Sequence, residues 1–241
     1  MIYDVADLRI GMENRFAWTD RFCEKWLSED QSSPADFTVG VTPEALGRER
    51  QAAEERGERY SDGYIENICL YREICLRLPR YDRFLLHGAV VGCDGEGYAF
   101  LGRSGAGKTT HTGLWLKYFD GTRILNGDKP ILSFSDGRMY ANGTPWMGKE
   151  GRGEKGKLPL KALCFVEQAK ENSIVRLTAG QAAERIFTQL LLPTEEESAA
   201  RTLELADKLV TLTDAWLLRC DVSREAAKIS YDALTGKKAK E

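Results

Sequence analysis

The sequence predicts an α/β fold built on a mixed, hairpin-rich sheet with flanking helices. Two apolar runs, FLLHGAVVG and GYAFLG, are joined by the Gly/Asp turn CDGEG, which is typical of a hairpin. A second pair, ILSF and MYANG, is joined by SDGR in the same way. Strands joined by such short turns are antiparallel. We expect a mixed sheet that contains both hairpins.

The first 80 residues are predicted to form an N-terminal appendage that packs on a core domain of residues 81–241. Short apolar pieces at 1–3 and 37–41 indicate strands, and residues 21–27 indicate a helix. The charged segment 47–63 has helix propensity but almost no apolar stripe, which predicts a solvated helix or a loop. The segment YIENICLYREICLRLPRYD predicts a helix that Pro79 ends.

From residue 84 onward the elements follow closely. We expect residues 89–91 to pair with 98–101, a helix at about 108–118, and a strand interrupted near Pro130. The segment 147–157 is too rich in Gly and Lys for a regular element. The remaining expectations are core strands at 160–167 and 173–177, helices at 179–191 and 195–213, a last strand at 215–220 and a last helix at 223–234.

Composition and charge narrow the class of protein. The net charge of −3 argues against nucleic acid and anionic membranes as partners, since both favour a basic surface. No apolar run approaches the roughly twenty residues that span a bilayer, and the opening MIYDVADLRIG lacks the pattern of a signal peptide. The six cysteines show no CxxC pair. We therefore expect a soluble, reduced, cytoplasmic protein.

The segment GRSGAGKT (102–109) matches G-x-x-x-x-G-K-[ST] at every fixed position. Its glycines permit positive φ, so that successive backbone N–H groups can converge on phosphate oxygens. Lys108 would reach the β- and γ-phosphates, and the Thr109 hydroxyl could bind Mg²⁺. This predicts a site for ATP, or for another nucleotide or polyphosphate. The residues expected to bind it are Gly102, Ser104, Gly105, Ala106, Gly107, Lys108, Thr109 and Thr110.

The hairpin before this loop, with His87–Gly88 in FLLHG, the run GRSGAGKTTHTGLW and the strand ILNGDKPIL, resembles the HPr kinase/phosphorylase and PEP-carboxykinase-like superfamily. The resemblance covers roughly residues 65–235 and extends through NGTPWMGKEG and LPLKALCFVEQAKENSI. It implies that superfamily's P-loop fold, and an Mg²⁺- and ATP-dependent kinase. Because HPr kinases form hexamers, it also implies a possible homo-oligomer.

The resemblance carries specific roles to Lys108, Thr109 and Asp128. In the superfamily one carboxylate of an acidic pair holds the metal and its neighbour takes the acceptor's proton. Without gaps, that pair falls on Gly127 and Asp128, so only one carboxylate is present. We expect His87, Lys108 and Asp128 to be catalytic, with Thr109 and Asp128 as metal ligands.

The proton acceptor is left open among three residues. An unperturbed imidazole titrates near neutrality, which would suit His87 to acid–base work, although a buried histidine bonded to backbone fits its spacing equally well. Glu150 could reach the site from a flexible loop or remain a solvated side chain. Asp128 itself could bind metal and take the proton.

Further residues near the loop have two interpretations each. His111 could face the phosphates or partner Asp128. Trp115 is expected to pack between helix and sheet, and packing is also favoured for Trp146 over stacking on a base. The basic cluster at 149–157 could close over an anion or form an exposed, mobile loop. Its members are Lys149, Arg152, Lys155 and Lys157.

Three functions follow from these residues. The leading one is a kinase that transfers a phosphoryl group to a hydroxyl on a metabolite, a peptide or a carrier protein. Gly127 motivates the alternative, a nucleotide-binding regulator that has lost catalysis. The third, PEP-carboxykinase-like chemistry, needs a second metal site and basic residues for which the sequence offers no match.

Overall fold

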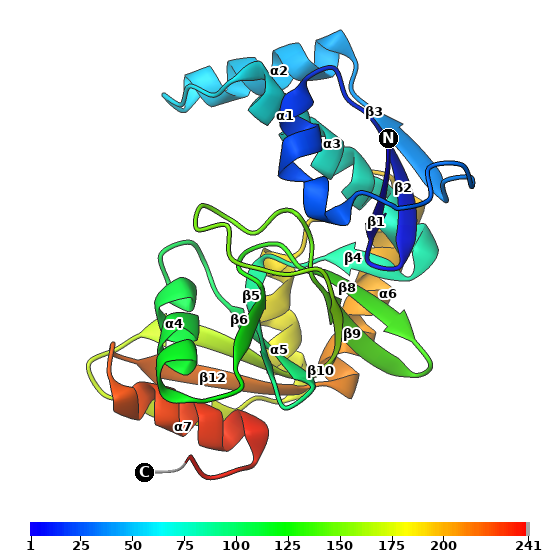
Figure 1. Ribbon diagram of the computed structural model, residues 1–241. Coiled ribbons are helices and arrows are strands. Elements are labelled where there is room, and N and C mark those ends of the chain that lie inside the picture. Colours follow the sequence, from blue (N-terminus) through cyan, green and yellow to red (C-terminus); the bar gives the residue numbers. More distant parts are fainter. Residues whose placement is uncertain (240–241) are drawn as a thin grey trace.

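The computed structural model describes residues 1–239, which form a small sheet with helices and a larger, curled mixed sheet (Figure 1). The first 81 residues contain β1 (Ile2–Val5), β2 (Leu8–Glu13), α1 (Ala17–Phe22), β3 (Phe37–Gly40), α2 (Pro43–Glu55), α3 (Asp62–Arg77) and two 3-10 helices, Glu24–Trp26 and Leu78–Tyr81.

Residues 82–239 contribute nine strands and four α-helices. In chain order these are β4 (Arg83–Leu85), β5 (Gly88–Cys93), β6 (Glu96–Leu101), α4 (Lys108–Tyr118), β7 (Arg123–Asn126), β8 (Ile131–Ser135), β9 (Arg138–Asn142), β10 (Lys157–Gln168), β11 (Ser173–Arg176), α5 (Ala179–Ile186), α6 (Glu196–Leu212), β12 (Asp214–Cys220) and α7 (Arg224–Thr235). A 3-10 helix, Phe187–Gln189, follows α5.

The N-terminal part is more regular than its sequence suggests. The two short strands were predicted, but β2 was not, although it pairs antiparallel with β1 and parallel with β3. The helix expected at 21–27 lies earlier, as α1 followed by a 3-10 helix. The charged segment does form a helix, α2, which begins after the Thr42 cap and ends at Glu55. The helix ended by Pro79 is confirmed as α3.

The large sheet contains both predicted hairpins. β5 and β6 pair antiparallel from Gly88 opposite Leu101 to Cys93 opposite Glu96, and β8 pairs antiparallel with β9. β10 then joins two parts of the sheet. Its first residues pair antiparallel with β9, and its later residues lie parallel to β6 and β12. This change of partners along one long strand curls the sheet.

Two strand predictions need correction. FLLHGAVVG is not one strand: β4 ends at Leu85 and pairs with β8, while β5 begins at Gly88 and pairs with β6 and β7. β11 is not a core strand. It lies at the edge beside β12 and leaves Val175 half exposed, because only one of its edges is paired.

Helices cover both faces of the sheet. Along β6, alternate residues point to opposite sides. Leu101 joins a cluster with α5 and α6, whereas Phe100 joins one with α4 and α7. β6 is therefore buried on both faces, and the loop that leaves its end starts from a rigid support.

A third hydrophobic cluster joins the N-terminal part to the large sheet. It contains residues of β1, β2 and α3 together with Leu85, Ile131 and Trp146. The buried Trp26 ring nitrogen also donates to the Gly143 carbonyl at 3.2 Å. These contacts hold α3 in place above the loop after β6. The domain boundary near residue 80 stays a prediction.

Within residues 1–239, no helix is long and apolar enough to cross a membrane. All six cysteines are buried and unbonded to one another. Cys164 and Cys220, which lie inside apolar runs of the sequence, are among them.

Candidate functional site

The glycine loop, residues 102–107, connects β6 to α4. Gly102, Gly105 and Gly107 all have positive φ, and Gly107 is the N-cap of α4. A Cβ at Gly102 would lie 3.0 Å from the Val166 carbonyl oxygen, so glycine is required there for close approach to β10 as well. The loop thus places the N-terminal amides and the positive dipole end of α4 at the surface of a cavity.

Lys108 opens α4 and folds back over the loop. Its ammonium donates to the Gly102 carbonyl at 2.6 Å and to the Arg103 carbonyl at 3.3 Å. Burial lowers the pKa of Lys108, and the nearby Asp128 carboxylate opposes that effect. The side chain is 9% exposed and carries a positive charge beside the loop.

Asp128 is held by a turn that Asn126 organises. The fully buried Asn126 side-chain oxygen accepts from the amides of Asp128 and Lys129, at 2.9 and 2.7 Å. The Asn126 amide nitrogen in turn donates to Thr144. These bonds fix the direction in which Asp128 leaves the backbone.

His87 lies beside Asp128, with 3.4 Å between Nε2 and the carboxylate Oδ1. Burial acts to raise the pKa of Asp128, but hydrogen bonds from His87 and Lys129 outweigh it and lower the pKa to about 2. Asp128 is therefore ionised at neutral pH. The His87 side chain is 38% exposed, so it is not the buried, backbone-bonded histidine of the alternative interpretation.

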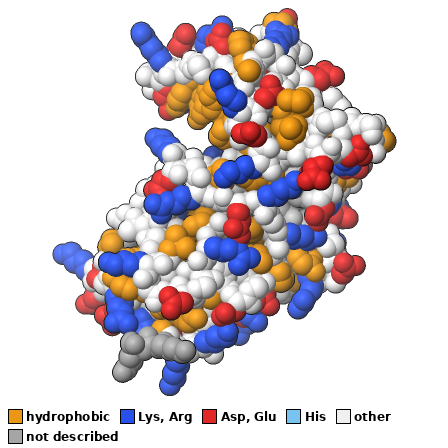
Figure 2. All heavy atoms as spheres, viewed as in Figure 1, with side chains coloured by type: hydrophobic (Ala, Val, Ile, Leu, Met, Phe, Trp, Pro, Cys, Tyr) orange, Lys and Arg blue, Asp and Glu red, His pale blue; other side chains and the backbone are white. Residues whose placement is uncertain are grey.

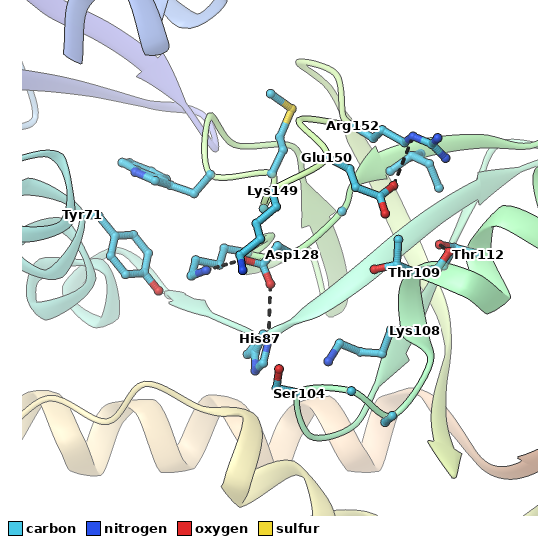
Figure 3. A pocket seen from close by; sticks show the side chains of 18 of the residues that line it. Tyr71, His87, Ser104, Lys108, Thr109, Thr112, Asp128, Lys149, Glu150 and Arg152 are labelled. Carbon is cyan, nitrogen blue, oxygen red and sulfur yellow. Dashed lines mark hydrogen bonds and ion pairs between the residues drawn. The ribbon is translucent and has the colours of Figure 1, made fainter. Parts of the chain in front are cut away.

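These residues line one cavity of about 860 Å³. Figure 3 shows Lys108, His87 and Asp128 near its centre, with Tyr71 on one side and Thr109 and Thr112 on the other. The predicted residues that line it are His87, Ser104, Gly105, Ala106, Gly107, Lys108, Thr109, Thr110 and Asp128. Gly102 lines instead a neighbouring cavity on the far side of the loop.

A strap, residues 147–153, lies directly on the Asp128 turn. The Glu154 amide donates to the Leu125 carbonyl at 3.1 Å, and Gly153 forms a bridge with Asn126. A Cβ at Gly127 would lie 2.8 Å from the Met147 carbonyl oxygen and 3.0 Å from that of Arg152. Gly127 thus serves close backbone packing, and the strap is a packed element of the cavity.

The basic cluster divides into two pairs. Lys149 and Arg152 line the cavity. Lys155 and Lys157 instead form ion pairs with Asp4 and Asp7 of the N-terminal part, at 3.7 and 2.6 Å. Glu150, one of the three candidates for the base, lines the cavity but pairs with Arg152 at 3.3 Å.

His111 faces away from the cavity, so both sequence-based interpretations of it were wrong. It lies 2.8 Å from the Ser230 hydroxyl of α7, and burial lowers its pKa to about 4. The Trp115 ring nitrogen donates to the same hydroxyl at 2.9 Å, which confirms the packing role expected for Trp115. Trp146 is likewise packed, with its ring nitrogen donating to Asn67 at 3.0 Å.

The buried His111 makes stability depend on pH. The pKa of His111 is about 4 in the folded protein, below the ordinary 6.5. Its contribution to the free energy of unfolding is therefore fully present above pH 6.5 and is lost as pH falls toward 4. We expect wild type to lose about 2 kcal/mol from this group between pH 7 and pH 5. Urea unfolding at pH 7 and at pH 5 measures this loss, and His111→Gln should lose about 2 kcal/mol less than wild type between the two pH values. If the variant and wild type lose the same free energy of unfolding, other groups cause the acid sensitivity.

Sequence reasoning missed the wall that α3 contributes to the cavity. Tyr64, Asn67, Ile68, Tyr71 and Arg72 all line it. Their spacing of three, four, seven and eight residues places them on one helix face, and that mixed polar and aromatic stripe is a signal the sequence does contain. The stripe alone does not say what it faces.

The chemistry of the donors fits Mg²⁺. The ionised Asp128 and the Thr109 hydroxyl are hard oxygen donors in one cavity, and Mg²⁺ is commonly held by one or two carboxylates together with phosphates and waters. Among the described residues, no group of three or more His, Cys, Asp or Glu side chains is placed to hold a metal by itself.

No family model matches the chain, and a comparison with curated proteins finds no match either. Among solved structures, the HPr(Ser) kinase/phosphatase from Coxiella burnetii matches with 12% identity and a TM-score of 0.28. The match covers 50% of this chain and 86% of that one. Similarity at this level does not define a family for the chain.

Proposed function

We propose that this protein is an Mg²⁺- and ATP-dependent kinase that transfers the γ-phosphoryl group to a hydroxyl. One observation carries the proposal: the glycine loop, Lys108, the ionised Asp128 and His87 converge in a single cavity. Phosphoryl transfer depends mainly on positioning and on neutralising charge, and these groups supply both.

Each residue has a distinct role in this proposal. The amides of the glycine loop and of the first turn of α4 bind the phosphates, and Lys108 neutralises charge on the transferred group. Asp128 and Thr109 would hold Mg²⁺, which adds further charge neutralisation when bound. With the Nε2 proton of His87 directed at Asp128, the lone pair on Nδ1 is left to accept the acceptor's hydroxyl proton.

The chemical step is a simple exchange. The acceptor oxygen bonds to the γ-phosphorus, and the bond from that phosphorus to the β–γ bridging oxygen breaks. The hydroxyl proton passes to His87, and the products are ADP and a phosphoester. In this proposal His87 takes the role of the carboxylate that is absent at position 127.

The direct test is ³¹P NMR of the protein with ATP, Mg²⁺ and a pool of hydroxylated metabolites and peptides. We expect a phosphoester resonance that disappears when EDTA removes the metal. Nucleotide line broadening without any phosphoester, across the whole pool, would favour the alternative of a nucleotide-binding regulator. Gly127 motivates this alternative, because it leaves the turn with one carboxylate instead of two.

Replacing His87 with asparagine tests the proton acceptor. Asparagine can still donate to Asp128 but cannot accept a proton, so kcat should fall by about a hundredfold while the KM for ATP changes little. Asn14→Ala, in the N-terminal part and outside the cavity, is the control. If His87→Asn keeps the wild-type rate, the proton acceptor is Asp128 and not His87.

A further inference from the structure

The cavity extends well beyond the glycine loop, and its far wall is aromatic. That wall, formed by Phe22, Tyr64, Ile68, Tyr71 and Trp146, comes mostly from the N-terminal part of the chain. Tyr71 and Trp146 are 9% and 6% exposed, and their ring centroids lie 5.2 Å apart. Figure 2 shows the hollow between the two parts of the molecule, with hydrophobic side chains on its upper edge.

The position of the wall decides which substrate it faces. In Figure 3, Thr109 and Thr112 lie on one side of Lys108 and Asp128, and Tyr71 lies on the other. With Lys108 at the β- and γ-phosphates, a nucleotide bound along the first turn of α4 would have its nucleoside on the threonine side. In-line transfer requires the acceptor to approach from the opposite side, which is the side of Tyr71.

The charges on the wall indicate an uncharged ligand. Arg72 is the cation that α3 presents to the cavity, and its guanidinium is bonded to the buried Glu49. On the floor, Lys129 is bonded to Asp128. Both of these cations have an anionic partner, and Arg152 of the strap pairs with Glu150. Lys149 also lines the cavity, but it belongs to the strap and not to the aromatic wall, whose side chains offer apolar surface to a ligand.

Resting on the kinase function proposed above, we infer that the aromatic wall binds the acceptor, and that the acceptor is an uncharged alcohol with an aromatic or branched apolar group near its hydroxyl. The apolar group packs against Ile68, Tyr64 and Phe22, and the hydroxyl lies toward His87 and Asp128. Tyr71, packed against Trp146, forms part of the same wall.

The test measures binding and not turnover, so that it stands apart from the test of kinase activity. Ligand-observed NMR is run on the full chain with Mg²⁺ and a non-hydrolysable ATP analogue, using 2-phenylethanol, glycerol and glycerol 3-phosphate as probes. We expect 2-phenylethanol to bind and the other two to bind at least about tenfold more weakly. Tighter binding of glycerol 3-phosphate would overturn the inference in favour of an anionic acceptor.

Matched variants locate the bound alcohol. Ile68→Ala should weaken 2-phenylethanol about fivefold and leave the ATP analogue unchanged. Leu27→Ala, an exposed apolar residue of the same part of the chain outside the cavity, should change neither. If Ile68→Ala weakens the ATP analogue instead, the wall holds the nucleoside and the inference is wrong. Loss of phosphoester formation with binding intact would reject only the kinase function.

Discussion

Replacement of Lys108 with alanine is expected to lower kcat/KM for phosphoryl transfer by about a thousandfold. The ammonium lies against the Gly102 carbonyl, near enough to Asp128 for the two to interact electrostatically. Its loss leaves the transferred group without its main protein cation. Steady-state kinetics with saturating acceptor, or single-turnover ³¹P NMR, measures the effect.

Lys117→Ala is the control for this prediction. Lys117 lies near the end of the same helix, exposed, with its ammonium 5.0 Å from the centre of the Tyr118 ring. It should retain wild-type kinetics. Comparable rates for Lys108→Ala and wild type would remove the basis of the proposed function, since the glycine loop would then have no part in turnover.

Substitution of Gly127 is expected to destabilise the fold and to lower turnover, even when it restores a second carboxylate. Any Cβ at this position meets the carbonyl oxygens of Met147 and Arg152 at 3.0 Å or less. Both are backbone atoms, so the strap itself must shift. We expect Gly127→Ala to cost about 2 kcal/mol, and Gly127→Asp more, because its carboxylate would meet two carbonyl oxygens.

Thermal unfolding measures this effect, which should lower the Tm of Gly127→Ala by about 5 °C. Gly113→Ala is the matched control, since a Cβ there meets nothing within 4 Å in the middle of α4 and should be neutral or stabilising. A stable, more active Gly127→Asp would show that the strap moves freely, and that the turn had simply lost an acid.

Local patterns in the sequence predicted most of the secondary structure and the residues of the glycine loop. Turn residues fixed both hairpins, and α4 begins at the lysine of the motif. β11 was expected at the right residues but wrongly in the core, because the apolar content of SIVRL does not reveal that the strand lies at the edge of the sheet. β2 was missed although LRIGME does carry the signal: Leu8, Ile10 and Met12 alternate with less apolar residues, which is the pattern of a half-buried strand.

In the candidate site too, residues of local motifs were predicted, whereas contacts that depend on distant parts of the chain were not. Lys108 and Asp128 follow from motifs, and both line the same cavity. His111 was misread because three residues along a helix can lead either to the phosphates or to the opposite face, and only the position of α7 decides. Gly127 looked like a missing acid, whereas the contact that requires glycine comes from residues 147–152, about twenty positions away. Long-range backbone packing of this kind leaves no local pattern.

The hydrophobic cluster shared by the two parts of the chain bears on how such a protein can diversify. Leu85, Ile131 and Trp146 are buried against the N-terminal strands and α3, and the Arg83 guanidinium donates to the Ala6 carbonyl at 2.6 Å. Replacing residues 1–80 as a block would break these contacts and expose the apolar side chains of the cluster. Point substitutions on the cavity face of α3, such as at Tyr64 or Ile68, leave this hydrophobic cluster intact. If the aromatic wall binds the acceptor as inferred above, new acceptor preferences would arise by single substitutions along α3, without a change in the glycine loop.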